Sequence, residues 1–279
     1  MRTEKMITAI AIFFAMIGSS SIAQEKYQLI YKLEKGVTYR YAQDIAIESS
    51  REMGGQEMKF NADGHNVTHF IVEDVSPSGM MTILYAYEEY KIHTKGMGRD
   101  TTMDIAGMTG KRVQVELSRL GKVEKETTID TGKVEGRSIA MKFMGGLHFP
   151  LLPENQVGTG DKWPKNSTDT SNMEEGQTIT KSSFEYTLTG KETKGKHDCL
   201  RIDFKGTTET TGKLKQMGMD LILEGNGEIS GTVWFDPSAG LMTEVQTTTS
   251  MELTMAMTGQ AQMTIPMSQK ITSKQSLME

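Results

Sequence analysis

The chain has 279 residues, of which 37% are hydrophobic, and its 31 Lys and Arg against 36 Asp and Glu give a net charge of −5. An acidic chain without a basic patch is not expected to bind nucleic acid, because that affinity depends on neutralising phosphates. A single cysteine excludes an intrachain disulfide and every multi-cysteine metal site. After the first 23 residues, no stretch approaches the roughly 18–20 apolar residues that a membrane-spanning helix needs.

The first 23 residues have the pattern of an export signal. Arg2 and Lys5 give a positive start, the apolar run Met6–Ile17 follows, and small residues lead to Ala23. We expect a signal peptide at residues 1–23 and a mature chain from Gln24, located in the periplasm or outside the cell. A short anchor helix is the alternative, but a run of about a dozen residues is too short to span a membrane. No cysteine follows the run, which excludes attachment as a bacterial lipoprotein.

Residues 24–128 predict a series of antiparallel strands. Apolar and polar side chains alternate with a period of two, which is typical of strands with one buried face. The predicted strands are 27–31, 37–47, 58–60, 69–73, 81–92, 113–117 and a strand from residue 123. The predicted turns lie at 35–36, 54–55, 76–79 and 119–121, where Gly and Pro supply the required backbone angles.

Residues 129–176 differ in pattern. Residues 130–146 predict a helix, because apolar side chains recur four apart, Asp130 is a suitable N-cap and two glycines end the run. Residues 149–164 contain three of the six prolines and predict an extended connector.

The strand pattern returns in residues 177–279. Strands are predicted around 184–188, 199–204, 221–223, 229–235, 241–249, 251–257 and 263–267. A turn is predicted from Gly190 to Lys196, and the segment Asp236–Gly240 is the sharpest turn signal in the chain. We therefore expect one β-rich domain over residues 24–279, composed of a strand-rich half (24–128), a helix with its linker (129–176) and a second strand-rich half (177–279).

Two segments carry a resemblance to known proteins. Leu152-Pro153, Val157 and Gly160-Asp161-Lys162-Trp163 resemble a connector found in a family of uncharacterised exported bacterial β-rich proteins. Residues 231–240 (GTVWFDPSAG) resemble a hairpin of the same family, and a similar hairpin occurs in periplasmic lipoprotein carriers of the LolA and LppX type. The resemblance implies a mainly β fold with a strongly curved antiparallel sheet, either a half-barrel or two packed sheets, and one packed helix near the concave face. It also implies that some members enclose an apolar ligand, and it transfers no catalytic residue.

The histidines and the cysteine do not form a recognisable catalytic or metal-binding motif. His65 and His69 are four residues apart, about 13 Å along a strand, which is too far for them to share one ion without a turn near Gly64. His197 and Cys199 share one strand face, but two ligands do not make a site. Alternation places Cys199 opposite the apolar face of its strand, where a structural thiol is favoured over a reactive one. We therefore expect no metal, no cofactor and no enzymatic activity.

The 22 methionines are the unusual feature of the composition. The pairs Met217/Met219 and Met255/Met257 each place two thioethers on one strand face. Such pairs could capture Cu(I), line an adaptable apolar surface or act as ordinary core residues, and ordinary core packing is the simplest of the three.

These observations define an expected ligand site. It consists of Phe143 and Met144 from the predicted helix and Met255 and Met257 from a facing strand. The function expected from these features is non-catalytic binding or carriage of an apolar molecule or lipid between sheet and helix. The alternative is a structural or protein-interaction module with a filled core and no small ligand.

Overall fold

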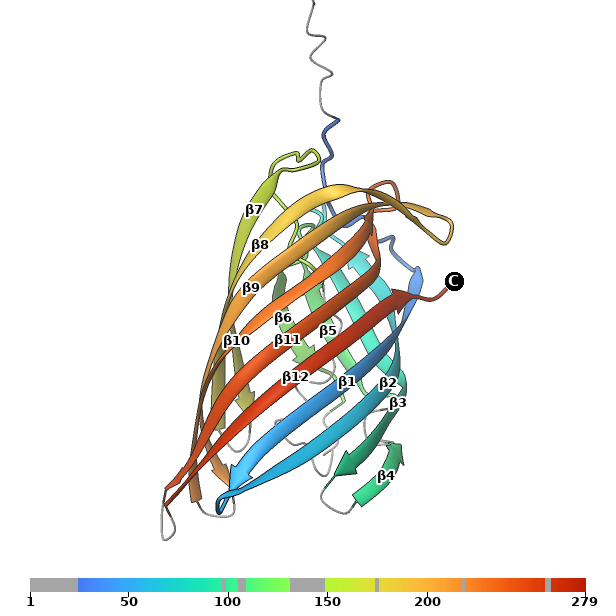
Figure 1. The fold of residues 1–279 in the computed structure, drawn as a ribbon. Helices are drawn as coiled ribbons and strands as arrows, with labels where there is room; N and C mark the ends of the chain where they lie inside the picture. The colour runs from blue at the N-terminus through green and yellow to red at the C-terminus, as the bar shows by residue number, and fades with distance from the viewer. Residues whose placement is uncertain are drawn as a thin grey trace, which may run out of the picture.

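Twelve β-strands form a single antiparallel sheet in the computed structural model, which describes residues 25–96, 99–104, 109–130, 149–173, 176–216, 219–258 and 262–279 (Figure 1). The strands are β1 (Thr38–Met53), β2 (Gln56–Val75), β3 (Met81–Gly96), β4 (Arg99–Asp104), β5 (Arg112–Leu117), β6 (Val123–Thr128), β7 (Lys162–Met173), β8 (Gly176–Lys194), β9 (His197–Gln216), β10 (Met219–Asp236), β11 (Leu241–Thr258) and β12 (Met263–Leu277). Their order is β6-β5-β3-β2-β1-β12-β11-β10-β9-β8-β7, and β4 pairs with β3. The prediction of a mainly antiparallel β fold is confirmed.

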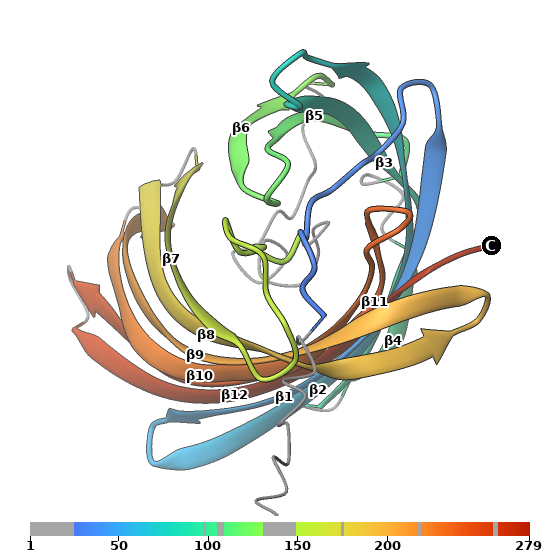
Figure 2. The same cartoon turned by 90° about the horizontal axis from the view of Figure 1, so that it is seen from above.

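The strands at the two ends of the sequence join the two strand-rich halves. β1 pairs with β12 from Tyr41↔Leu277 to Arg51↔Met267. The sheet is not closed, because β6 and β7 end the pairing order and do not pair with each other. Figure 2 shows the sheet bent around an interior, with β6 and β7 on either side of its opening. The molecule is therefore one open, bent sheet rather than two packed sheets.

The predicted turn at residues 236–240 is confirmed, and its atoms explain why the signal was strong. The Asp236 carboxylate accepts hydrogen bonds from the backbone N–H groups of Ser238 (2.8 Å) and Ala239 (2.9 Å). The Gly240 N–H donates to the Asp236 carbonyl over 2.8 Å, and Gly240 adopts φ 65°, which favours glycine.

Residues 27–31 do not form a strand of the sheet, contrary to the prediction. The segment runs through the interior beside residues 149–161 (Figure 2), and Tyr27 makes an isolated bridge with Val157. Its alternation has another cause, since Leu29, Tyr31 and Leu33 are all buried in the main core. An extended chain inside a bent sheet buries alternate side chains as a strand does, so the two cases have the same sequence pattern.

β7 lies in the segment predicted as a connector. It pairs with β8 from Lys162↔Thr187 to Met173↔Gly176, and its sequence is almost entirely polar after Trp163. An edge strand has a neighbour on one side only and tolerates this composition, so hydrophobic alternation gave no signal. The turn predicted from Gly190 also begins later, because β8 continues to Lys194 after a bulge between Leu188 and Gly190.

The main core lies between the sheet and the interior segments. Phe70 and Phe235 of the sheet are fully buried, and the exposed fractions of Tyr31 and Leu152 in the interior segments are at most 2%. The Tyr31 ring makes edge contacts with Phe235 at 5.4 Å and with Phe149 at 5.5 Å between ring centroids. We call the sheet face that carries these contacts the inner face and the opposite one the outer face.

The predicted helix at 130–146 lies outside the described residues except for Asp130. The Asp130 carboxylate accepts hydrogen bonds from the backbone N–H (2.9 Å) and the guanidinium group (3.0 Å) of Arg112. These bonds lower the pKa of Asp130 to about 2. Within the described residues, no helix is long and apolar enough to cross a membrane.

Candidate functional site

Charged residues are confined to one face over most of the length of the C-terminal strands. Cross-strand partners share a face, so the register assigns each position to the inner or the outer side. Every Asp, Glu, Lys and Arg lies on the outer face in the following stretches: Gly176–Leu188, Leu200–Leu214, Leu221–Phe235, Met242–Met257 and Met263–Leu277. Over these stretches the inner face is thus a wide uncharged surface, and Lys191 and Asp198, at the end next to the β8–β9 turn, are the charged residues of β8 and β9 that share the face of Leu200.

The structure brings two of the four predicted ligand-site residues together. Met255 pairs with Leu223 of β10 and Ile265 of β12, and Met257 pairs with Leu221. Both methionines are partly exposed on the inner face, whereas Leu221, Leu223 and Ile265 are buried. Their shared face on one strand is confirmed. The other two predicted residues, Phe143 and Met144, lie outside the described residues.

A group of neutral polar side chains interrupts the inner face beside the main core. The Asn66 amide N–H donates to Gln43 Oε1 over 2.9 Å, and Thr68 Oγ1 donates to Asn66 Oδ1 over 3.4 Å. Gln275 pairs in register with Gln43, and the exposed fractions of Gln43, Asn66, Thr68 and Gln275 are between 2% and 6%. We call these four residues the amide cluster.

One acceptor of the amide cluster has no donor. Gln275 Oε1 is buried, and no described residue donates a hydrogen bond to it. A buried acceptor without a donor costs about 1–3 kcal/mol, so among the described residues this is the polar atom of the cluster that is left unsatisfied.

A second neutral polar region lies on the inner face of β8 and β9. Thr180 and Thr210 share a hydrogen bond of 3.1 Å between their hydroxyls, and Thr178 is buried. Thr208 Oγ1 is buried without a partner among the described residues. Gly227 lies opposite Thr208, and a Cβ atom there would approach that hydroxyl to 3.2 Å. A side chain at this point would therefore crowd the hydroxyl, and glycine avoids that.

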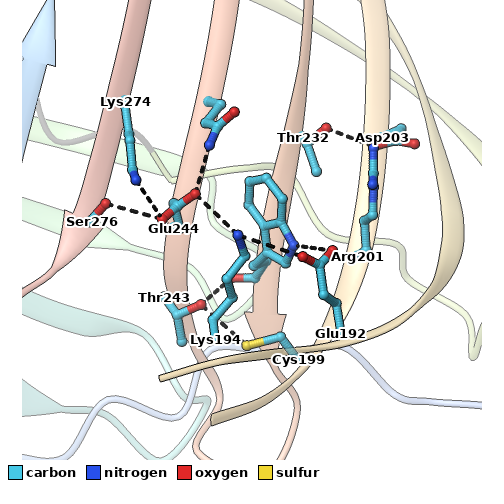
Figure 3. Close-up of polar contacts among 12 residues, drawn as sticks. Glu192, Lys194, Cys199, Arg201, Asp203, Thr232, Thr243, Glu244, Lys274 and Ser276 are labelled. Atoms are coloured by element: carbon cyan, nitrogen blue, oxygen red, sulfur yellow. Dashed lines mark hydrogen bonds and ion pairs between the residues drawn. The ribbon is translucent and has the colours of Figure 1, made fainter. Parts of the chain in front are cut away.

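On the outer face, Trp234 belongs to a polar network, whose members Glu192, Lys194, Glu244 and Lys274 are shown in Figure 3. Its indole N–H donates to Glu192 Oε2 over 2.8 Å, and Lys194 Nζ lies 3.8 Å from the ring centroid. The β8–β9 hairpin supplies both residues and covers the ring, which is 5% exposed. Trp163 lies instead in the main core, stacked on Tyr186 with 5.6 Å between ring centroids.

Glu244 connects the Trp234 network to β12. Its carboxylate lies 3.5 Å from Lys194 Nζ and 3.2 Å from Lys274 Nζ, and it accepts hydrogen bonds from Gln246 (2.8 Å) and Ser276 (3.4 Å). Burial raises the pKa of the Glu244 carboxyl, but the hydrogen bonds and the two ammonium groups outweigh it and hold the pKa below its usual value. We call Glu192, Lys194, Trp234, Glu244 and Lys274 the tryptophan clasp. Each of these groups is satisfied within the protein.

Cys199 and His197 belong to the same outer-face region and have structural partners. Cys199 Sγ lies 3.2 Å from Thr243 Oγ1, and burial raises the pKa of its thiol. Its position opposite the apolar face of β9 is confirmed, because Leu200 and Ile202 lie in the main core. His197 Nδ1 lies 2.7 Å from Asp236 Oδ2, the carboxylate of the 236–240 turn.

Grooves on the outer face are polar. One of about 750 Å³ crosses β10–β12 and β1–β4, and another of about 520 Å³ continues along β11, β12, β1 and β2. His65 lines the first groove, with Nδ1 2.6 Å from Asp44 Oδ1, and β2 runs through Gly64 without a turn. His69 instead contacts Glu88 at 3.1 Å. Within the described residues, no three His, Cys, Asp or Glu side chains are placed to hold a metal ion.

No protein-family model matches the chain, and a search of the curated proteins finds no match either.

The sequence reasoning missed the amide cluster. Its members come from β1, β2 and β12, so no local spacing links them. A signal was present, because Gln43 and Gln275 occupy the apolar phase of their strands, between Tyr41 and Ile45 and before Leu277. A polar amide in that phase indicates a buried polar group that requires a partner.

Proposed function

We propose that this protein binds a largely apolar molecule, without covalent chemistry, against the inner face of its open sheet. The observation that carries the proposal is the exclusion of charge from the inner face over Gly176–Leu188, Leu200–Leu214, Leu221–Phe235, Met242–Met257 and Met263–Leu277. A filled core would explain apolar side chains there, but this face also carries partly exposed methionines, glycines and threonines. Methionine suits surfaces that adapt to a ligand.

Two further features support binding rather than a packed interior. The sheet has free edges at β6 and β7, so a molecule has a route to the inner face that a closed barrel would deny. Thr208 Oγ1 and Gln275 Oε1 are buried on that face without a described partner. Buried polar atoms in folded proteins are nearly always paired with protein, water or a ligand.

Native mass spectrometry tests the proposal directly. The protein is purified without detergent from the cells that make it, and its mass is compared before and after organic extraction. A reproducible added mass that extraction releases is the expected result. A bare mass in repeated gentle preparations would contradict the proposal and favour the alternative, an interaction module that pairs through its free β6 and β7 edges.

A matched pair of charge insertions locates the site. Met255→Glu places a carboxylate on the inner face, and Thr254→Glu places the same group on the outer face one residue away. Binding of diphenylhexatriene, followed by its fluorescence, should fall at least about tenfold in Met255→Glu, because a charge on an apolar surface is costly to bury. It should be unchanged in Thr254→Glu. Equal binding by both variants would place the site elsewhere.

We also propose that the protein works outside the cytoplasm, on the support of the export-signal pattern of residues 1–23. Cell fractionation followed by N-terminal sequencing tests this. A mature chain that begins at Gln24 in a cell-envelope or secreted fraction is expected, and an intact Met1 in the cytoplasm would contradict it.

A further inference from the structure

The amide cluster differs from every other polar group buried on the inner face by the number of amides it brings together. Gln43, Asn66 and Gln275 come from three adjacent strands in register. Two of the amides bond to each other, and the third keeps a buried acceptor, Gln275 Oε1, for which the described residues provide no donor. The cluster is therefore built to receive one more hydrogen-bond donor.

An uncharged surface extends away from this acceptor along β12. Ile271 and Met267 follow Gln275 on the inner face and are partly exposed, and the neutral side chains Ser273 and Gln269 lie between them. The distance from Gln275 to Met267 is about 26 Å at the rise of a β-strand, comparable to a long acyl chain. A polar end at Gln275 and an apolar body along β12 describe an amphiphile.

The charge of the polar end is constrained by the surroundings. The other buried polar side chains of the inner face are Gln43, Asn66 and four threonines, all of them neutral. No Lys or Arg lies on the inner face of β12, β11 or β10 to neutralise an anion. An ionised headgroup at this position would be buried without a partner, which is strongly unfavourable.

We propose that the ligand is an uncharged amphiphile whose hydroxyl or amide N–H donates to Gln275 Oε1, rather than an ionised fatty acid. This inference rests on the binding function proposed above and names the ligand class of the same site.

Displacement of diphenylhexatriene, a hydrocarbon without hydrogen-bonding groups, tests the selectivity on the full chain. Oleyl alcohol and oleate share a chain and differ in the headgroup. At pH 8 the alcohol should displace the probe at a concentration at least about tenfold lower than oleate, because oleate must bury its charge or take up a proton. The difference should narrow at pH 5, where oleate takes up a proton more readily.

A pair of identical substitutions on one strand face separates the hydrogen bond from general packing. Gln275→Leu removes the acceptor, whereas Gln269→Leu makes the same change three inner-face positions away on β12. Oleyl alcohol should bind about fivefold more weakly to Gln275→Leu than to the unmodified protein. Gln269→Leu keeps the acceptor and makes the surface under the apolar body more apolar, so it should not weaken the binding of oleyl alcohol. Diphenylhexatriene should bind no more weakly to either variant than to the unmodified protein.

The outcomes distinguish this inference from the function on which it rests. Diphenylhexatriene binding with equal displacement by alcohol and oleate at pH 8, or with equal effects of the two leucine variants, would overturn the assignment of the headgroup alone. A protein that binds none of the three probes would overturn the binding function as well.

Discussion

The tryptophan clasp and the amide cluster are both buried polar groups on the same sheet, and they differ in how completely they are satisfied. In the clasp, the indole N–H has its acceptor at 2.8 Å and the Glu244 carboxylate has four partners. In the amide cluster, the Asn66–Gln43 bond leaves Gln275 Oε1 without a described donor. The first lies on the outer face and the second on the inner face.

The difference is the basis for assigning a structural role to the clasp and for proposing a binding role for the amide cluster. A fully satisfied network stabilises the conformation that makes it, here the β8–β9 hairpin folded over Trp234 (Figure 3). A network that lacks one partner reduces stability and is expected where a ligand supplies that partner. The predictions below test this contrast by removing groups from each side.

The largest effect is expected at Trp234. Trp234→Ala should lower the free energy of unfolding by about 3–5 kcal/mol, because it removes a buried ring and leaves a cavity. Urea unfolding followed by circular dichroism measures the loss. Trp234→Phe keeps most of the apolar volume without the N–H donor to Glu192, and should lose only about 1 kcal/mol. Equal losses in the two variants would mean that the hydrogen bond, rather than packing, dominates.

Leucine substitutions within the amide cluster should have opposite consequences. Gln43→Leu removes the acceptor of Asn66 and should cost about 1–3 kcal/mol, because it leaves a buried amide unpaired. Gln275→Leu removes an acceptor that already has no described partner, so it should be nearly neutral or stabilising. Thermal and urea unfolding of the ligand-free protein compare them. A large loss in Gln275→Leu would show that the side chain has a structural partner and would remove the contrast with the clasp.

Glu244 should make the clasp sensitive to acid. The pKa of Glu244 is lower in the folded protein than in the unfolded chain. The ionised carboxylate therefore stabilises the fold at any pH above its pKa in the unfolded chain, and this contribution is lost as the pH falls through its pKa in the folded protein. At pH 7, Glu244→Gln should be less stable by about 1 kcal/mol, a modest figure because Lys274 is largely exposed. The gap should narrow as the pH is lowered from 7 towards 3. A gap that stays constant from pH 7 to pH 3 would assign the effect to packing instead of charge.

The last prediction concerns Cys199 and is measured as the reactivity of its thiol instead of as a change in stability. Burial raises the pKa of the thiol, and the side chain is 2% exposed beside Thr243. Labelling with iodoacetamide at pH 8 should be at least about tenfold slower in the folded protein than in urea. Equal rates would mean that the β8–β9 hairpin opens readily and that the clasp is weaker than its contacts indicate.

Local chemistry explains which parts of the fold the sequence predicted. The turn at 236–240 was readable because Asp, Pro and Gly act within five residues. The alternation of residues 251–257 was readable because apolar side chains occupy one face of β11 there and polar or small ones the other. The edge strand β7 was missed because its polar sequence lacks the alternating apolar residues that indicate a strand with one buried face. The interior segment at 27–31 was misassigned because burial on alternate residues does not require strand pairing.

The sequence by itself determined that the chain is a mainly β protein with sharp turns, and it placed Met255 and Met257 on one strand face, because period-two alternation and turn chemistry are local properties. Only the tertiary structure decided that the two halves form one open sheet, that the hairpin of β8 and β9 covers Trp234, and that three amides from β1, β2 and β12 meet beside the core. Register between strands distant in sequence depends on the packing of the whole sheet. For that reason local sequence pointed to individual methionines as the binding site, whereas the structure points to the inner face of the sheet and to Gln275 Oε1, which has no donor among the described residues.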